Sequence, residues 1–519
     1  MTNAAENIWR HAEERPSATG LREGQGDQER SWTFNELRLG ISGVMAQLQE
    51  KGVGPGTRVL MTLPTGAEFV LAYHAVLALG ATAVTVNPLS APRELEYYIT
   101  DSGAAFALGW REPGFEPDAL TGAVVEVPTP VWILQPGDLD ATAAQAPARI
   151  ADTAPEDTAA VLYTSGTTGR PKGAVLTHRN ITSAGALLSK TMELLPEDRL
   201  GTALPLFHVF GQGPVMAATY TAGAAFTVIR PFDPNLTLEI AAEHRLTGLA
   251  GVPTMWNAML HVETDRTAED FKHMRLASSG GAALPLEVAR AFKERFGGEV
   301  LEGYGLTETT GAATFNKPGG VRKEGSVGLP VPGIDIAVVD QEGQLLPRGE
   351  VGEIALDGPV VMQEYWNRPE ATDATRHGRW FLTGDLGRMD EDDFVFIVDR
   401  KKDLVIRGGY NVYPREVEEV LYAHPDVQEA AVAGVPDERL GEEVAAVVAL
   451  REGAQEDAAA LRAWLGERLT AYKVPRIYRF VEALPKGATG KILKRAINLE
   501  DLHALGVRPP RTADSSTKA

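Results

Sequence analysis

Hydroxyl groups, glycines and two cations are concentrated in one short stretch of the sequence, between two apolar segments. This stretch reads VLYTSGTTGRPKGAVLTH and spans residues 161–178. Its glycines let the backbone approach a ligand closely, its serine and threonines offer donors, and Arg170 and Lys172 supply positive charge. Such a loop has the components of a phosphate-binding site. A surface turn rich in Gly, Ser and Thr is the structural alternative.

The loop differs from the common mononucleotide-binding loop. That motif requires Gly, four residues, and then Gly-Lys followed by Ser or Thr. In this sequence Gly166 and Gly169 are three positions apart, and Lys172 is followed by Gly173. The loop is therefore a different phosphate-binding device, and other parts of the chain must identify it.

Six further stretches combine polar side chains with flexible glycines or aromatic residues. They are LPLFHVFG with His208, ASSGGAALP with Gly280 and Gly281, LEGYGLTETT with Tyr304, Thr307 and Glu308, WFLTGDLG with Asp385, DRKKD with Arg400, and LPKGATGKILKR with Lys491.

Taken one at a time, these residues also have structural explanations. Asp385 fits a turn cap, Glu308 fits a capping pattern at the start of a helix, and His208 fits a buried histidine between aromatic rings. Lys491 and the charged DRKKD run fit a solvated surface.

Length and composition exclude several classes of function. The chain has 519 residues, 44% of them hydrophobic and 23% charged, which indicates a soluble globular protein with more than one domain. The formal net charge of −20 argues against nucleic acid or an anionic membrane as the main partner. Because the sequence contains no cysteine, disulfides, thiolate metal sites and a cysteine nucleophile are excluded, and a cytoplasmic location is expected.

No targeting or membrane-spanning segment is expected. The N-terminal MTNAAENIWRHAEERP has charges where a signal peptide has an apolar core. The most apolar stretch, from Val70 to Pro88, is short and contains His74 and Gly80. It therefore predicts a buried helix followed by a strand.

Helix-like and strand-like segments alternate over most of the sequence. The helical TFNELRLGISGVMAQLQEKGV precedes the strand-like TRVLMTL, and further strands are expected at AVLYTS, GTALPLF and AAFTVIRPF. This alternation predicts an α/β fold with largely parallel sheets. Short strands from DIAVVDQEG onward predict a smaller β-rich subdomain.

The charged run at residues 399–403 marks the expected boundary between two domains. We expect an N-terminal domain at residues 1–398 and a small C-terminal domain at residues 404–504. Residues 505–519 contain little that could be buried and are expected to form a disordered tail.

Together, the seven stretches resemble the motifs of the adenylate-forming superfamily, which includes acyl-CoA synthetases, firefly luciferase and the adenylation domains of peptide synthetases. The resemblance covers roughly residues 30–500, and the motifs occur in the family's order. It implies a large N-terminal domain of two αβ-layered sheets with a small β subdomain, and a small mobile α+β C-terminal domain. It also implies that ATP converts a carboxylic acid into an acyl-adenylate with release of pyrophosphate, after which CoA takes the acyl group and AMP leaves.

Two anions must meet in such a reaction, so cations and hydrogen-bond donors have to stabilise the developing charge. The resemblance implies ATP, Mg²⁺ and coenzyme A as cofactors and co-substrates. Glu308 is expected to help hold Mg²⁺ on the ATP phosphates.

The resemblance also assigns roles to individual residues. The expected catalytic residues are Lys491, Glu308, Thr307, His208 and Thr164. ATP or AMP is expected to contact Thr164, Ser165, Gly166, Thr167, Thr168, Gly169, Lys172, Gly280, Gly281, Ala282, Glu302, Tyr304, Gly305, Thr307, Asp385, Ile397, Arg400 and Lys491. The acyl group is expected to contact His208, Phe210, Val252, Gly281 and Gly305, and the pantetheine arm is expected to contact Gly408, Gly409 and Tyr410.

Charge and flexibility explain several of these roles. Asp385 suits the ribose hydroxyls because a carboxylate accepts two hydrogen bonds. Lys491 is expected to bridge the substrate carboxylate and the α-phosphate with a compact charge. The resemblance makes residues 399–403 a hinge that pivots at Lys402. In one orientation of the C-terminal domain Lys491 enters the site, and in the other the RGGYN segment does.

The acyl substrate is expected to be apolar. Amino-acid-activating members of the superfamily carry an Asp in the pocket wall, where this sequence has His208. The segments expected to line the pocket, FHVFGQGPVM, AGVPTMWNAML and SGGAALP, contain no Arg or Lys that could pair with a second carboxylate. A fatty acid is favoured and an aromatic acid is the alternative. A carrier protein as acyl acceptor, a luciferase-like oxidation, a non-catalytic binding protein and a homodimeric state remain open.

Overall fold

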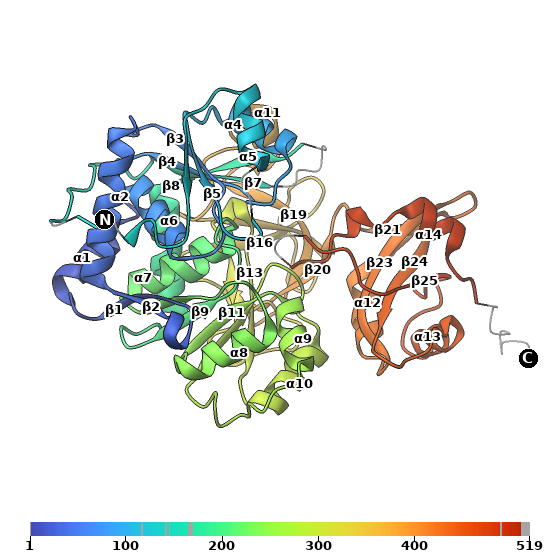
Figure 1. Cartoon of the computed structure of the whole chain (residues 1–519). Helices are drawn as coiled ribbons and strands as arrows, with labels where there is room; N and C mark the ends of the chain where they lie inside the picture. Colours follow the sequence, from blue (N-terminus) through green and yellow to red (C-terminus); the bar gives the residue numbers. More distant parts are fainter. Residues whose placement is uncertain are drawn as a thin grey trace, which may run out of the picture.

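Four sheets organise the part of the chain that the computed structural model describes, which comprises residues 2–115, 118–140, 143–144, 146–164, 170–487 and 490–509 (Figure 1). Two large sheets form the body at the N-terminal side. A small antiparallel sheet adjoins them, and the fourth sheet belongs to a separate body near the C-terminus.

The six-stranded sheet is parallel except at one edge, where β8 runs antiparallel to β7. The loop between β7 and β8 contains residues 165–169, which lie outside the described residues. In sheet order the strands are β6 (Val131–Leu134), β5 (Phe106–Trp110), β3 (Arg58–Met61), β4 (Thr82–Thr85), β7 (Thr158–Thr164) and β8 (Lys172–Thr177).

The helices that connect these strands include the most apolar helix of the chain. All twelve residues of α3 (Ala67–Ala78) are buried, because the helix contacts β4 of this sheet and β1 of the next. The predicted helix and strand within residues 70–88 are therefore confirmed. The neighbouring helices are α2 (Phe34–Glu50), α4 (Pro92–Ser102) and α5 (Asp118–Glu126).

The nine-stranded sheet is parallel in its centre and antiparallel at both edges. In sheet order its strands are β15 (Leu329–Pro330), β14 (Thr314–Phe315), β13 (Val300–Tyr304), β12 (Leu276–Ser279), β11 (Gly248–Gly251), β9 (Arg199–Thr202), β10 (Ala225–Val228), β1 (Thr19–Glu23) and β2 (Arg30–Thr33). The associated helices are α1 (Glu6–Glu14), α6 (His178–Thr191), the π-helix η3 (Gly211–Ala217), α7 (Ala218–Ala222), α8 (Pro234–Glu243), α9 (Pro253–His261) and α10 (Leu286–Phe296). The predicted α/β class is confirmed.

The predicted β-rich subdomain is a five-stranded antiparallel sheet. Its long strand β19 carries Asp385, and β20 leads to the charged run. The elements are β16 (Asp335–Val339), β17 (Gly352–Asp357), the short helix α11 (Pro369–Asp373), β18 (Arg376–His377), β19 (Trp380–Met389) and β20 (Val395–Arg400).

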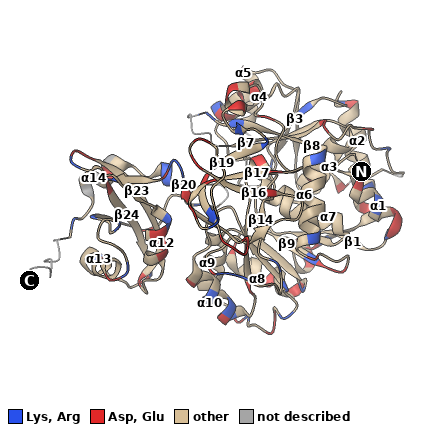
Figure 2. Cartoon of the chain, turned by 180° about the vertical axis from the view of Figure 1, so that it is seen from behind, with Lys and Arg blue, Asp and Glu red and all other residues tan. Residues whose placement is uncertain are grey.

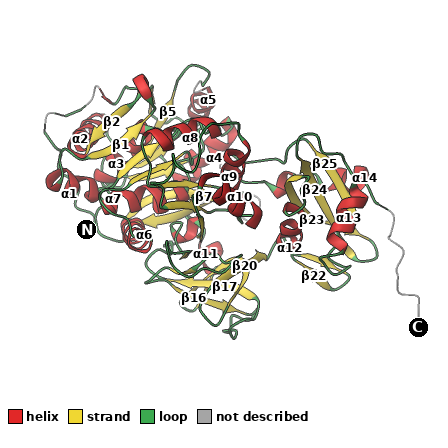
Figure 3. Ribbon diagram, turned by 90° about the horizontal axis from the view of Figure 1, so that it is seen from below, coloured by secondary structure: helices red, strands yellow, loops and turns green. Residues whose placement is uncertain are grey.

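The C-terminal body is set apart from the large sheets in Figure 3, and it has its own apolar core. The last buried residue of the large core is Val395, and the first of the C-terminal core is Val405, on either side of residues 399–403. The body consists of β21 (Val405–Arg407), β22 (Tyr410–Val412), α12 (Pro414–Tyr422), β23 (Val427–Asp437), β24 (Gly441–Leu450), α13 (Ala458–Gly466), β25 (Ile477–Val481), the 3₁₀ turn η5 (Lys494–Ala496) and α14 (Leu499–Leu505).

Ordered structure extends further than the expected tail boundary. Val507 pairs with Tyr478 of β25 through two backbone hydrogen bonds of 2.7 and 2.9 Å. The expectation of disorder is therefore wrong for residues 505–509, because the edge of β25 offers backbone partners to an extended segment. Residues 510–519 lie outside the described residues.

Acidic and basic residues are spread over both bodies rather than gathered on one face (Figure 2). Among the described helices, none has both the length and the apolar character that crossing a membrane requires.

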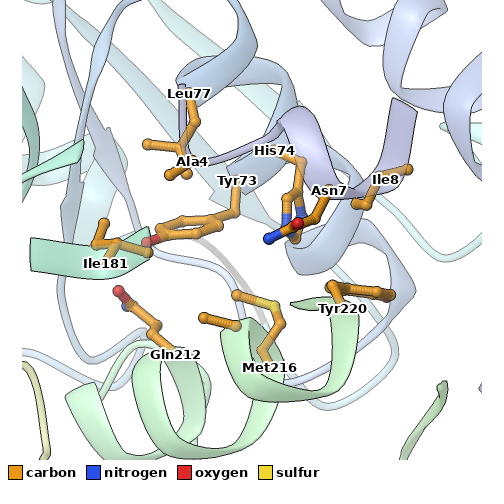
Figure 4. A pocket seen from close by; sticks show the side chains of 11 residues that line it. Ala4, Asn7, Ile8, Tyr73, His74, Leu77, Ile181, Gln212, Met216 and Tyr220 are labelled. Atoms are coloured by element: carbon orange, nitrogen blue, oxygen red, sulfur yellow. The ribbon is translucent and has the colours of Figure 1, made fainter. Parts of the chain in front are cut away.

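A small enclosed cavity lies between α1, α3 and η3 (Figure 4). Its volume of about 10 Å³ is at the lower limit for holding a single water molecule. Tyr73, Tyr220 and Gln212 line it, and both tyrosine hydroxyls lack a hydrogen-bond partner among the described residues. This cavity lies away from the place where the predicted motifs meet.

Candidate active site

The predicted motifs meet at one large cavity of about 1120 Å³ between the sheets of the N-terminal body and the Lys491 segment. Its wall combines residues that are several hundred positions apart in the sequence. The predicted site residues that line it are Thr164, Lys172, His208, Phe210, Gly280, Gly281, Ala282, Glu302, Tyr304, Gly305, Thr307, Glu308, Asp385, Ile397, Arg400, Lys402 and Lys491.

The remaining predicted residues lie elsewhere. Val252 is buried just before α9 and does not line the cavity, so the structure does not support its predicted contact with the acyl group. Gly408, Gly409 and Tyr410 lie at the β21–β22 turn, outside the cavity wall, where Tyr410 stacks on Tyr472 with ring centroids 4.9 Å apart. Ser165, Gly166, Thr167, Thr168 and Gly169 lie outside the described residues.

One end of the cavity is built around Glu308. β7 and β8 hold Thr164 directly opposite Lys172. Glu308 Oε1 lies 3.5 Å from Thr164 Oγ1 and accepts a 2.6 Å hydrogen bond from the hydroxyl of Tyr365. Lys172 Nζ lies 5.0 Å from the centre of the Tyr365 ring. A carboxylate, hydroxyls and a cation therefore converge where the predicted phosphate loop begins.

Glu308 does not act as a simple helix cap. It lies with Thr307 in a single 3₁₀ turn, η4 (Thr307–Thr309), and its carboxylate is engaged by side chains from other elements. Burial and the adjacent carboxylate raise the pKa of Tyr365 well above its usual range, so its hydroxyl keeps its proton and donates. Tyr365 could not be recognised from the sequence, since one tyrosine in EYWNRPE carries no distinguishing pattern.

A second part of the cavity wall is built around Asp385, which is 5% exposed in the middle of β19. The Tyr304 hydroxyl donates to Asp385 Oδ2 at 2.6 Å, and Arg400 Nε lies 3.5 Å from Oδ1. Burial raises the pKa of Asp385, while Arg400 and Tyr304 act in the opposite direction. The carboxylate is held by side chains facing the cavity, which differs from a turn cap.

Lys491 is partly buried and extends over Gly281. A Cβ atom at Gly281 would lie 2.6 Å from Lys491 Nζ, and Gly281 has a left-handed φ of +80°, so glycine is required for two reasons. Burial and the charge of Arg400 lower the pKa of Lys491 to about 8. The side chain is therefore part of the site rather than a solvated surface lysine.

His208 lies beside Lys491 in the cavity wall. The backbone N–H of Phe210 donates to His208 Nδ1 at 3.3 Å, which fixes the ring. Burial and the charge of Lys491 hold the pKa of His208 well below its usual value. The imidazole is therefore neutral, and it forms a wall of the cavity between aromatic residues.

Family comparisons agree with this arrangement. Residues 8–366 match the family described as AMP-binding enzyme, and residues 416–491 match its C-terminal domain. The chain belongs to the AMP-binding enzyme family. The predicted membership of the adenylate-forming superfamily is confirmed.

Other AMP-binding enzymes resemble the chain over nearly its whole length. It is 38% identical over 504 residues to a long-chain-fatty-acid–CoA ligase of Bacillus subtilis (strain 168), with 90% of each chain covered. It is 36% identical over 498 residues to a feruloyl-CoA synthase of Amycolatopsis sp., covering 95% of this chain and 98% of that one. The crystal structure of ATP-bound MatB from Rhodopseudomonas palustris matches with a TM-score of 0.88 at 35% identity, covering 97% of this chain and 99% of that one.

The C-terminal domain of this AMP-binding enzyme contacts the cavity through Arg415 at the start of α12. Arg415 Nη1 donates to the carbonyl of Ile397 at 2.8 Å, and Nη2 lies 3.8 Å from Glu302 Oε1. Glu302 also accepts from the N–H of Leu284 at 3.2 Å, and burial raises its pKa to about 7. Arg415 could not be recognised from the sequence, since nothing in its local pattern distinguishes it from a surface arginine.

The donor set fits Mg²⁺ only if phosphate oxygens complete it. Among the described residues there is no group of three or more metal-ligating side chains, and Glu308 is the carboxylate at the Thr164–Lys172 end. Mg²⁺ commonly uses one or two carboxylates together with substrate phosphates and water. The site therefore suits a metal ion that arrives with the nucleotide.

Proposed function

We propose that the protein is an ATP-dependent acyl-CoA synthetase that forms an acyl-adenylate and pyrophosphate, and then an acyl-CoA thioester and AMP. The observation that carries the proposal is the convergence of Glu308, Asp385 and Lys491 on one cavity from three separate parts of the chain. It is supported by the long-chain-fatty-acid–CoA ligase and the feruloyl-CoA synthase, whose alignments cover at least 90% of this chain.

The nucleotide lies, in this proposal, along the wall from Thr164 to Asp385. Asp385 accepts hydrogen bonds from the ribose hydroxyls, with Arg400 beside it. Gly280, Gly281, Ala282, Glu302, Tyr304, Gly305 and Ile397 enclose the adenosine, while Thr164, Thr307, Lys172 and residues 165–169 surround the phosphates. Glu308, together with the ATP phosphates, would hold Mg²⁺, which would supply charge neutralisation at the triphosphate.

Lys491 brings the two anions together. Its ammonium bridges the substrate carboxylate and the α-phosphate, so that a carboxylate oxygen attacks phosphorus and pyrophosphate leaves. The depressed pKa of about 8 describes the site without anions. A bound carboxylate and phosphate favour the charged form of the amine, so the cation is retained during the reaction.

The second half-reaction requires a different orientation of the C-terminal domain. Lys402 is exposed in the turn between β20 and β21, and Gly408, Gly409 and Tyr410 are outside the cavity wall. We place the pivot at Lys402, within the hinge at residues 399–403 that separates domains 1–398 and 404–504. Rotation of the C-terminal domain about Lys402 withdraws Lys491 from the cavity and brings the β21–β22 turn to the pantetheine thiol.

The acyl pocket suits a monocarboxylic acid with an apolar remainder. Burying a second charge without a partner is costly. Between residues 188 and 257 the described lining contains no Lys or Arg and consists of Leu188, Met192, Phe207, His208, Val209, Phe210, Pro214, Pro253, Thr254 and Asn257. A fatty acid is our first choice and an aromatic acid the second, which matches the two relatives named above. The proposed location is the cytoplasm.

The test incubates the protein with ATP, Mg²⁺ and separate fatty, aryl and dicarboxylic acids, with and without CoA. Pyrophosphate and acyl-CoA are measured in parallel. We expect both products from fatty acids, and little of either from dicarboxylic acids. Acid-dependent pyrophosphate without consumption of CoA would instead favour a carrier protein as the acceptor, and no pyrophosphate from any acid would refute the proposal.

A further inference from the structure

The segment that carries Lys491 is tied to the N-terminal body by a hydrogen bond from Thr254. Thr254 Oγ1 donates to the carbonyl of Gly490 at 2.7 Å, across 236 positions of sequence. Gly490 directly precedes Lys491, so this bond acts on the backbone next to the proposed catalytic amine. Thr254 lies outside the seven stretches that carry the family resemblance, and it was named above only as part of the acyl-pocket lining.

The donor is rigidly held. Thr254 is the second residue of α9, which begins at Pro253 and directly follows β11 through the buried Val252. The same helix is fixed to α10 by the perpendicular rings of Trp256 and Phe292, whose centroids are 5.0 Å apart. The hydroxyl of Thr254 is therefore presented from a packed helix and not from a loop.

The backbone at the acceptor, Gly490, allows Thr254 to approach closely. Gly490 has a φ of +76°, and a Cβ atom there would lie 3.2 Å from Thr254 Oγ1 and 3.3 Å from Val252 Cγ2. The turn is also closed on itself, since the N–H of Gly490 donates to the carbonyl of Gly487 at 2.9 Å. Glycine suits this position for two reasons: the backbone conformation disfavours a side chain, and the neighbouring atoms approach closely.

Electrostatic attraction does not explain why Lys491 lies in the site. Burial and the neighbouring Arg400 both disfavour its ammonium form, and the described residues provide no ion pair for it. A neutral hydrogen bond beside Lys491 can hold the segment in place without depending on that charge. The contact between Thr254 and Gly490 is such a bond.

We infer that Thr254 is a positioning residue for adenylation, which holds the Gly490 carbonyl so that Lys491 extends over Gly281. This inference rests on the proposed function. Thr254 acts, by this inference, in the first half-reaction. In the second half-reaction the C-terminal domain has turned away, so Thr254 has no partner there. Removing its hydroxyl should therefore slow the formation of acyl-adenylate and leave thioester formation from preformed acyl-adenylate unchanged.

The first experiment compares Thr254→Val with Thr254→Ser in the two half-reactions, using fatty acid and ATP for one and synthetic acyl-adenylate with CoA for the other. Loss of one neutral hydrogen bond predicts that T254V adenylates about threefold to tenfold more slowly, mainly in kcat, while T254S stays close to the unchanged enzyme. In a Lys491→Ala background, T254V should have no further effect. Equal slowing of both half-reactions, full activity of T254V, or an undiminished effect in the Lys491→Ala background would overturn the inference.

A matched control separates this effect from a general loss of a threonine hydroxyl. Thr82 Oγ1 also donates to a distant backbone carbonyl, that of Thr158, at 3.0 Å, but within the six-stranded sheet. Thr82→Val should leave the ratio of the two half-reactions unchanged. A shift of that ratio as large as the one in T254V would contradict a specific role for Thr254.

A second readout does not depend on activity. In the unchanged protein the docked segment limits access to Lys491, so labelling of its amine by an amine-reactive reagent, followed by mass spectrometry, should be slow. T254V should label severalfold faster at Lys491, and T82V should not. Equal labelling in all three proteins would refute the docking role. Absence of acid-dependent pyrophosphate from the unchanged protein would refute the proposed function instead.

Discussion

The hydroxyl of Tyr304 donates a 2.6 Å hydrogen bond to Asp385, and this contact joins the end of β13 to the middle of β19. It links the nine-stranded sheet to the β-rich subdomain in the part of the cavity where we propose that the nucleotide binds. The other carboxylate oxygen of Asp385 lies 3.5 Å from Arg400, which stands directly opposite on β20. The carboxylate is thus fixed in position by residues from both sheets.

Asp385→Asn should weaken ATP binding. The substitution keeps the shape but replaces an ionised acceptor, and hydrogen bonds to charged groups contribute about 1.5–3 kcal/mol each. We expect KM for ATP to rise about tenfold to a hundredfold, with KM for the acid little changed. Steady-state kinetics with ATP as the varied substrate tests this. Asp335→Asn, at an exposed residue paired with Arg379, is the control and should not change KM for ATP.

Adenylation should decline in alkaline solution. Lys491 must be protonated to bridge two anions, and burial together with Arg400 lowers its pKa to about 8. Because the enzyme without bound anions loses the ammonium form as the pH rises through this value, kcat/KM for ATP should fall above pH 8. Lys491→Arg should be slower than the unchanged enzyme at every pH, and its pH profile should be flat in this range because arginine stays protonated. A profile of the unchanged enzyme that remains level well above pH 9 would exclude Lys491 as the titrating group.

Lys402→Pro should separate the two half-reactions. Proline restricts φ at the proposed pivot, so the C-terminal domain keeps the orientation that serves adenylation. We expect pyrophosphate formation to continue at a similar rate and acyl-CoA formation from synthetic acyl-adenylate to fall by at least tenfold. The control is Lys402→Ala. Lys401→Pro is unsuitable because Lys401 Nζ forms an ion pair with Glu353 Oε2 at 3.0 Å. Loss of both half-reactions in Lys402→Pro would place the pivot elsewhere.

The fold should lose stability in mild acid. Burial lowers the pKa of His74 and of His178 to about 4 each, whereas a histidine in the unfolded chain titrates near 6.5. Above that value both states are neutral and neither residue contributes. As the pH falls from about 6.5 to 4, the unfolded state binds protons first, so each histidine lowers the free energy of unfolding by about 1.4 kcal/mol per pH unit.

Thermal unfolding at pH 7.5, 6 and 5 tests this behaviour. The midpoint should fall with pH, and the fall should be shallower in His178→Gln than in the unchanged protein. His377→Gln alters an exposed histidine and should leave the slope unchanged. An identical slope in His178→Gln would show that other groups govern the acid sensitivity.

The sequence predicted the elements of the fold well because their signals are local. The apolar run around residue 75 can only be a core helix and strand, and the glycine-rich loop lies between two apolar strands, as expected. The order of the motifs was enough to identify the superfamily. Val252, expected in the acyl pocket, is not among the residues that line the cavity, and its Cγ2 lies beside Gly490, a contact with a segment far away in the sequence.

Contacts between distant segments account for most of what the sequence did not reveal. Tyr365 reaches Glu308 across 57 positions, and Thr254 reaches Gly490 across 236. Tyr365 has no neighbours in the sequence that mark it as part of a site, and the segment AGVPTMWNAML predicted for Thr254 only a place in the acyl pocket, not a contact with Gly490. Such partners are specified only when the sheets and the C-terminal domain are assembled in three dimensions.

The most direct test of the acyl-adenylate route follows one oxygen atom. The protein is incubated with ATP, Mg²⁺, CoA and a fatty acid whose carboxylate is labelled with ¹⁸O, and AMP is analysed by mass spectrometry. If a carboxylate oxygen attacks the α-phosphorus and CoA then displaces AMP, each AMP carries one labelled oxygen. Formation of acyl-CoA with unlabelled AMP would contradict the account, because the acid would then have been activated at another atom.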